Sequence, residues 1–140
     1  MARFDGACHC GRLKVAFETP SPAALSLRAC QCSFCRRHGA RNVSDPAGSL
    51  AISAEAASLH RYRFGRKGID MLICGECGTY VAALCEIDGA LYATLNITGA
   101  DIQGLTLGAA EPVDYEEETD AARLARRRAK WTPASLTLAA

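Results

Sequence analysis

Seven of the eight cysteines in this 140-residue chain fall into three short clusters, and their spacing restricts how the chain can fold. The clusters are Cys8 with Cys10, Cys30 with Cys32 and Cys35, and Cys74 with Cys77. An isolated cysteine is often a small buried hydrophobic residue, but that role does not explain clustering. Aromatic residues make up only 6% of the chain, and a small domain with so thin a core needs an added constraint such as bound metal.

Two of the clusters predict one closed zinc site. Residues i and i+2 of a strand face the same side, so the Cys-x-Cys pair can approach one ion together. The segment CGECG places glycines inside and directly after the Cys-x-x-Cys pair, where they allow a tight turn around a metal. Structural zinc takes four such ligands in a tetrahedron. We therefore predict a structural zinc that joins distant segments, with the ligands Cys8, Cys10, Cys74 and Cys77.

The remaining cluster offers three thiolates, and three protein ligands with an open fourth position are typical of a catalytic zinc. A zinc held by three thiolates is a weak Lewis acid that suits the binding of an exogenous thiol as thiolate. We predict a second zinc on Cys30, Cys32 and Cys35, with a water or a substrate thiol as fourth ligand. His38 and Cys85 are the alternatives, and either would close the site.

Alternating polar and apolar residues at 12–18 and 25–29, and short strand-like runs further along, predict a small, mainly β, antiparallel domain that the zinc staples together. The expected strands are residues 12–18, 25–29, 59–64, 69–73, 79–85 and 91–97. Residues 116–131 carry acids in the first turn and bases in the last, which predicts a C-terminal helix. We interpret its basic run at 126–130 as a solvated helix end. Residues 1–115 are expected to form the zinc-binding domain, and 116–140 a helix and tail packed on it or extending from it.

The charge and hydropathy of the chain exclude several classes of protein. With 16 basic and 15 acidic residues the net charge is +1, which predicts attraction to neither nucleic acid nor membranes. No segment approaches the roughly 18 apolar residues of a membrane span, and the first ten residues lack the apolar core of a signal peptide. We expect a cytoplasmic protein whose thiols are reduced or metal-bound.

Four segments together resemble the glutathione-dependent formaldehyde-activating enzyme family, which also includes centromere protein V. They are GACHCGRLKVAF, CQCSFCRRHGA, ICGECGTYV and LNITGADI, and the resemblance runs from about residue 4 to residue 101. It implies a β-tent-like fold with the two zinc sites described above. It also implies addition of glutathione to formaldehyde, a carbon–sulfur lyase reaction that gives S-(hydroxymethyl)glutathione. Gln31 and Met71 stand where members often have Asn and His, and these departures concern the substrate rather than the fold.

The residues and the resemblance lead to three functional hypotheses of different class. The first is an enzyme that joins glutathione or another small thiol to a small aldehyde, with Cys30, Cys32 and Cys35 as its catalytic residues. Arg36 and Arg37 are its candidate substrate-binding residues, because guanidinium groups match carboxylates, although they could equally offset the charge of the zinc–thiolate cluster. The second is a non-catalytic module with two structural zinc ions that acts through a partner surface. A third is a redox or zinc sensor that releases metal on oxidation.

Overall fold

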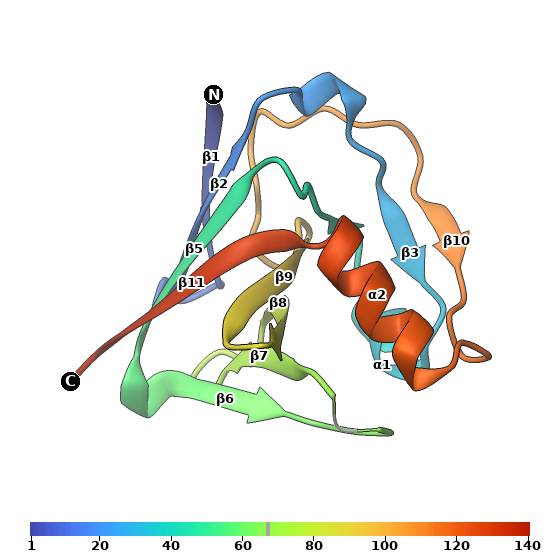
Figure 1. Ribbon diagram of the computed structural model, residues 1–140. Coiled ribbons are helices and arrows are strands. Elements are labelled where there is room, and N and C mark those ends of the chain that lie inside the picture. The colour runs from blue at the N-terminus through green and yellow to red at the C-terminus, as the bar shows by residue number, and fades with distance from the viewer. Residues whose placement is uncertain (67) are drawn as a thin grey trace.

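The computed structural model describes residues 1–66 and 68–140 and shows an open, mainly β fold with a C-terminal helix (Figure 1). The predicted mainly β class and C-terminal helix are confirmed. The strands are β1 (Ala2–Ala7), β2 (Leu13–Thr19), β3 (Arg28–Cys30), β4 (Asn42–Val43), β5 (Ser49–Glu55), β6 (Leu59–Tyr62), β7 (Asp70–Cys74), β8 (Tyr80–Ile87), β9 (Ala90–Asn96), β10 (Glu111–Val113) and β11 (Thr132–Ala139). The helices are α1 (Ser33–His38) and α2 (Asp120–Lys130), with 3-10 turns η1 (Pro22–Ala24) and η2 (Ala56–Ser58).

The strands belong to one sheet that branches at β9. One edge of β9 pairs with β8, and the other edge pairs with β11 at Tyr92 and Ala93 and with β4 at Leu95 and Asn96. From this point one branch runs through β11, β5, β2 and β1, and another through β4, β3 and β10. Most pairs are antiparallel, as predicted, but β11 runs parallel to β5 and β10 runs parallel to β3.

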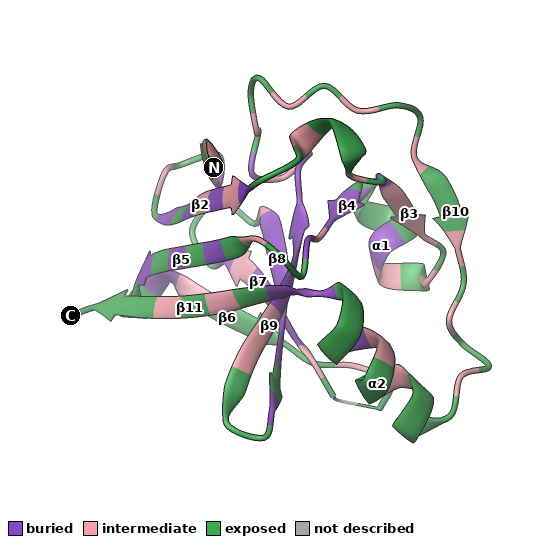
Figure 2. Cartoon of the chain, turned by 45° about the horizontal axis from the view of Figure 1, so that its top comes forward, coloured by how far each residue is buried: buried purple, intermediate pink, exposed green. Residues whose placement is uncertain are grey.

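The main core lies between β2, β5 and the central strands β8 and β9. Along β2 the residues Leu13, Val15 and Phe17 are buried, and they stand opposite Ala54, Ile52 and Leu50 of β5 in an antiparallel register. Both strands alternate buried with more exposed positions, as expected for strands with one face on the core. β8 is buried along most of its length because it lies within the sheet (Figure 2).

A second, smaller core lies under the three-cysteine cluster. It contains Cys35 of α1, Met71 of β7, Tyr80 and Cys85 of β8, and Trp131, which follows α2. Both helices lie on the side of the molecule that carries β3 and β10 (Figures 1 and 2). This core therefore joins the C-terminal helix to the segment that holds three of the clustered cysteines.

The C-terminal region differs from its prediction at both ends. Thr119 caps α2, because its Oγ1 accepts a hydrogen bond from the Ala122 amide at 3.1 Å, so the helix begins four residues later than expected. Beyond Trp131 the expected tail forms strand β11, which was not predicted. The division into residues 1–115 and 116–140 stays a prediction. No helix in the described part of the chain has the length and apolar character needed to cross a membrane.

Candidate metal centres

The structure brings the sulfur atoms of one four-cysteine cluster together. The atoms lie within 4.8 Å of one another and belong to Cys8, Cys10, Cys74 and Cys77. The Sγ atoms of Cys8 and Cys10 are 3.7 Å apart, and those of Cys10 and Cys74 are 3.5 Å apart. A tetrahedral zinc with Zn–S bonds of about 2.3 Å places its sulfur ligands about 3.8 Å from one another. The donor set and its spacing therefore fit a four-thiolate zinc site.

Hydrogen bonds in this cluster favour the thiolate form of some of its members. The Leu13 amide donates to Cys8 Sγ at 3.2 Å, and the Thr79 hydroxyl lies 3.3 Å from Cys77 Sγ. Although partial burial opposes it, hydrogen bonding to Thr79 lowers the pKa of Cys77 to about 5. Burial raises the pKa of Cys74 to about 11. A cation bound to all four sulfur atoms would remove that difference, because metal ligation favours the deprotonated thiol.

The second cluster is local in sequence. Cys30 ends β3, Cys32 caps α1, and Cys35 lies in its first turn, where its amide donates to Cys32 Sγ at 3.3 Å. The three sulfur atoms lie within 4.8 Å of one another. Hydrogen bonds from the thiols of Cys30 and Cys35 lower the pKa of Cys32 to about 2. The contact with Cys32 raises the pKa of Cys30, and the contacts with Cys30 and then Cys32 raise the pKa of Cys35. The cluster thus holds one thiolate readily and fits a cation that would deprotonate all three thiols.

Neither alternative fourth ligand joins this cluster. Neither His38 nor Cys85 has a ligand atom within 4.8 Å of all three sulfur atoms. His38 is exposed, and its ring packs on Phe34 with 4.3 Å between the centroids. Cys85 is buried elsewhere, with its Sγ 3.5 Å from the Gly68 carbonyl oxygen and 3.9 Å from Arg127 Nη1. Within the described residues the cluster therefore offers three protein ligands.

The three cysteines lie in the wall of a cavity of about 900 Å³. This volume lies within the usual range for small-molecule sites, about 300–1,000 Å³. Of the two predicted substrate-binding residues, Arg36 lines the cavity, and its Nε donates to the Gln31 carbonyl at 3.0 Å. Arg37 donates to the Ser33 carbonyl at 3.1 Å and is not among the described residues of the lining. Met71, one of the two departures from the family motif, is buried and lines the cavity.

Tyr80 is a cavity residue that the sequence reasoning missed. Its hydroxyl is buried and has no hydrogen-bond partner among the described residues, while burial and the nearby charge of Cys35 raise its pKa well above the usual value. The backbone there is fixed tightly. Asn96 Nδ2 donates to the Tyr80 carbonyl at 2.9 Å, and its Oδ1 accepts from the Arg41 amide at 3.1 Å. Gly99 lies so close that a Cβ there would be 1.9 Å from the Tyr80 oxygen.

Sequence alone does not separate this tyrosine from an ordinary core aromatic on a strand. Asn96 stands in the strand LNI, and the sequence analysis did not assign it a role; the structure shows that it holds the start of β8 in place. The one signal available was the position of Tyr80, two residues after Gly78 in the motif ICGECGTYV.

Comparisons with known proteins agree with the cysteine pattern. A family model described as "glutathione-dependent formaldehyde-activating enzyme" matches residues 3–104, more than half of the chain. A crystal structure of a Rhodobacter sphaeroides protein from a structural genomics programme is similar, with a TM-score of 0.58 and 26% sequence identity over 78% of this chain and 99% of that one. The region matched by the family model contains both cysteine clusters and Tyr80 and ends before α2.

Proposed function

The chain belongs to the glutathione-dependent formaldehyde-activating enzyme family, and from this membership we propose that it is a zinc-dependent carbon–sulfur lyase. Its substrates would be a thiol, glutathione or another small one, and a small aldehyde. The observation that carries the proposal is the three-cysteine cluster in the cavity wall, which neither His38 nor Cys85 completes. A site with three protein ligands and an accessible fourth position is suited to bind and activate a substrate.

The two clusters would have different roles. Cys8, Cys10, Cys74 and Cys77 would hold a structural zinc, and Cys30, Cys32 and Cys35 a catalytic one, which makes two zinc ions per chain. When bound, the catalytic zinc supplies a position for the substrate thiol and favours its deprotonated, nucleophilic form. The cytoplasmic location expected from the sequence stays a prediction.

The addition needs no oxidant or further cofactor. A bond forms between the thiol sulfur and the carbonyl carbon, the π pair of the carbonyl moves to its oxygen, and the thiol proton ends on that oxygen. Negative charge thus develops on the oxygen as the bond forms, and a fixed donor stabilises it. Tyr80 lines the cavity, and its hydroxyl, which has no hydrogen-bond partner among the described residues, would be such a donor.

The test measures adduct formation between glutathione and formaldehyde above the uncatalysed background. We expect an excess rate with the zinc-loaded protein that disappears in Cys32→Ala. The cobalt-substituted protein should show a new sulfur-to-cobalt absorption band on addition of glutathione. Cys85→Ala, which removes a cysteine outside both clusters, should keep the metal content and the band. Both metals in place with no band and no excess rate would instead favour the non-catalytic module.

A further inference from the structure

The C-terminal helix adds positive charge to the cavity that holds the three-cysteine cluster. Three arginines of α2 line this cavity, Arg123, Arg126 and Arg127. The helix lies outside residues 3–104, so the family match says nothing about these side chains. Any ligand that they bind therefore depends on the contacts of these side chains in this chain.

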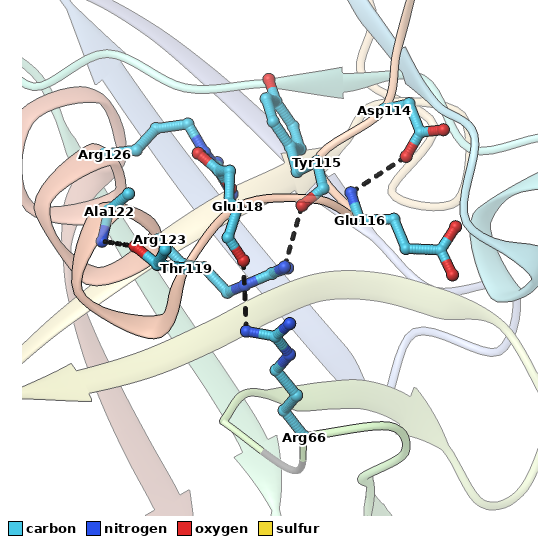
Figure 3. Close-up of polar contacts among 9 residues, drawn as sticks. All are labelled: Arg66, Asp114, Tyr115, Glu116, Glu118, Thr119, Ala122, Arg123 and Arg126. Atoms are coloured by element: carbon cyan, nitrogen blue, oxygen red, sulfur yellow. Dashed lines mark hydrogen bonds and ion pairs between the residues drawn. The ribbon is translucent and has the colours of Figure 1, made fainter.

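Arg126 has its charge matched within the protein. Its Nε and Nη2 donate to the two carboxylate oxygens of Glu118 at 2.9 and 3.0 Å, and its guanidinium lies 3.6 Å from the ring centroid of Tyr115 (Figure 3). This two-pronged pair is the arrangement that an arginine adopts with a carboxylate partner. The Arg126–Glu118 pair can therefore be compared with the contacts of the neighbouring arginines on the same helix.

Arg123 and Arg127 have no such carboxylate in the described part of the chain. Arg123 donates through Nη2 to the Tyr115 carbonyl at 2.8 Å, as Figure 3 shows, and its buried Nε has no hydrogen-bond partner there. Arg127 is only 6% exposed, and its Nε is likewise buried and unpartnered among the described residues. The sequence analysis interpreted this stretch as a solvated helix end, and for Arg127 that interpretation is wrong.

The surroundings of Arg127 give its charge no hydrogen-bonded carboxylate among the described residues. Its Nη1 lies 3.9 Å from Cys85 Sγ, and its guanidinium lies 5.4 Å from the ring centroid of Trp131. Burial lowers the pKa of Arg127, which means that the protein destabilises the cation. A buried charge without an anionic partner destabilises the fold. An anion that enters the cavity would offset this cost.

Besides Arg123 and Arg127, an arginine from β3 adds positive charge to the same cavity. Arg28 of β3 lines the cavity, and its Nη2 donates to the neutral hydroxyls of Ser44 and Thr94 at 2.8 and 3.0 Å. The lining also contains three acidic residues, Asp114, Glu116 and Asp120, which its six arginines outnumber. Asp120 pairs with Arg66, and Asp114 Oδ1 accepts from the Glu116 amide. The cavity that contains the cluster is thus lined by guanidinium groups whose hydrogen-bonding capacity the described residues leave partly unused.

We propose that Arg123 and Arg127 bind a carboxylate of the thiol substrate, so that this protein selects thiols that carry a carboxylate. The inference rests on the proposed function for the identity of the ligand as a thiol. The planar guanidinium fork suits a carboxylate, and Arg126, which adjoins Arg127 and lies about one turn after Arg123, shows that geometry with Glu118. Arg36, from α1, could contact the other carboxylate of a peptide thiol such as glutathione.

The test uses S-methylglutathione, which keeps both carboxylates of glutathione but has no free thiol. Calorimetric titration of the zinc-loaded protein should show binding that weakens about 10- to 100-fold in Arg127→Gln and in Arg123→Gln, as expected for loss of charge-assisted hydrogen bonds in a buried site. The diethyl ester of S-methylglutathione, with its carboxylates masked and no free thiol, should bind wild type as weakly as S-methylglutathione binds Arg127→Gln. Arg128→Gln is the matched control, because Arg128 is exposed on the same helix and pairs with Asp88 outside the cavity.

Folding and metal binding are checked separately. In the cobalt-substituted protein, 2-mercaptoethanol has no carboxylate and should give the same band in Arg127→Gln as in wild type. Arg127→Lys keeps the charge but not the fork and should recover part of the affinity. Equal binding of S-methylglutathione to wild type and Arg127→Gln would overturn the inference, as would strong competition by inorganic phosphate with none by acetate. Because S-methylglutathione cannot react, arginine-dependent binding would stand even if no excess rate were found.

Discussion

The two cysteine clusters differ in what they connect. In the four-cysteine cluster, Cys10 and Cys74 are 64 residues apart in sequence and yet 3.5 Å apart at their sulfur atoms, so the cluster joins the end of β1 to the turn between β7 and β8. In the three-cysteine cluster all ligands lie within six residues of one β3–α1 segment. A metal in the first closes a long loop, whereas a metal in the second constrains a segment that is already short.

From this difference we expect the four-cysteine cluster to affect the stability of the fold and the three-cysteine cluster to affect the proposed reaction. Because ligands from distant segments meet only in the folded chain, the binding energy of a metal there is coupled to folding. The local cluster can lose its metal without separating distant segments, and it lies in the cavity wall where a ligand can reach it. The clusters are nevertheless linked, since the Cys74–Cys77 turn leads within three residues to Tyr80, which packs in one core with Cys35 and lines the cavity of the second site.

The largest effect should come from Cys74→Ser. Structural zinc sites in zinc-finger peptides have binding free energies of about 10–16 kcal/mol, and loss of one of four ligands weakens such a site. We therefore expect the variant to lose most of its stability and to yield little folded protein. Thermal unfolding followed by circular dichroism measures this. Cys85→Ala, a buried cysteine outside both clusters, is the control and should unfold close to the wild type. A Cys74→Ser melt that matches this control would show that the four-cysteine cluster does not stabilise the fold.

Chelator titration should sharpen the same comparison with the wild-type protein. We expect two stages of zinc release, of which the first removes one metal with little change in the circular dichroism spectrum. The second should coincide with unfolding, because it removes the ion that holds β1 to the β7–β8 turn. A metal-sensitive dye and circular dichroism recorded on one sample would show the order. A single stage, with both ions released as the fold is lost, would contradict different roles for the two clusters.

Cys32→Ala should have a smaller effect on the fold and a complete effect on the proposed reaction. It removes the residue that caps α1, so we expect a loss of about 1 kcal/mol, typical of a missing cap, and one zinc per chain instead of two. Elemental analysis and a thermal melt measure both. If Cys32→Ala and Cys74→Ser were destabilised equally, the assignment of a structural and a catalytic cluster would be wrong.

Much of the sheet could be predicted because β2 alternates apolar with polar residues and β7 and β8 are short runs rich in apolar residues, patterns that are visible in the sequence. β2, β6, β7, β8 and β9 lie close to their predicted ranges. β5 was missed although its burial alternates strictly. Small Ala and Ser residues occupy both buried and exposed positions of this strand, so the hydropathy of the sequence does not show the alternation. β11 was missed because its parallel pairing with β5 depends on a partner more than 80 residues away, and no local pattern reports such a contact.

The residues of the candidate site also divide into those that the sequence pattern predicts and those that only the fold reveals. Cysteine spacing is a local property, so it indicated which sulfur atoms could approach one another before the structure was considered. The importance of Tyr80 and Arg127 arises only from tertiary packing. A tyrosine on a strand usually belongs to a core, and an arginine in the last turn of a helix usually faces water. Their buried, unpartnered polar atoms identify them as exceptions, and only the structure shows those atoms.

The smallest expected change in stability, and the sharpest test of the link between the clusters, is Tyr80→Phe. Because the hydroxyl is buried without a partner in the described residues, its removal should leave the free energy of unfolding unchanged or raise it by about 1 kcal/mol. If the hydroxyl donates to the developing oxyanion, the same change should lower the catalysed rate about 100-fold without altering the zinc content. Thermal melts, elemental analysis and the adduct assay measure the three quantities.

Tyr62→Phe is the control, since Tyr62 is 42% exposed and its hydroxyl should affect none of them. A destabilised Tyr80→Phe with an unchanged rate would show that the hydroxyl supports the fold and takes no part in the reaction.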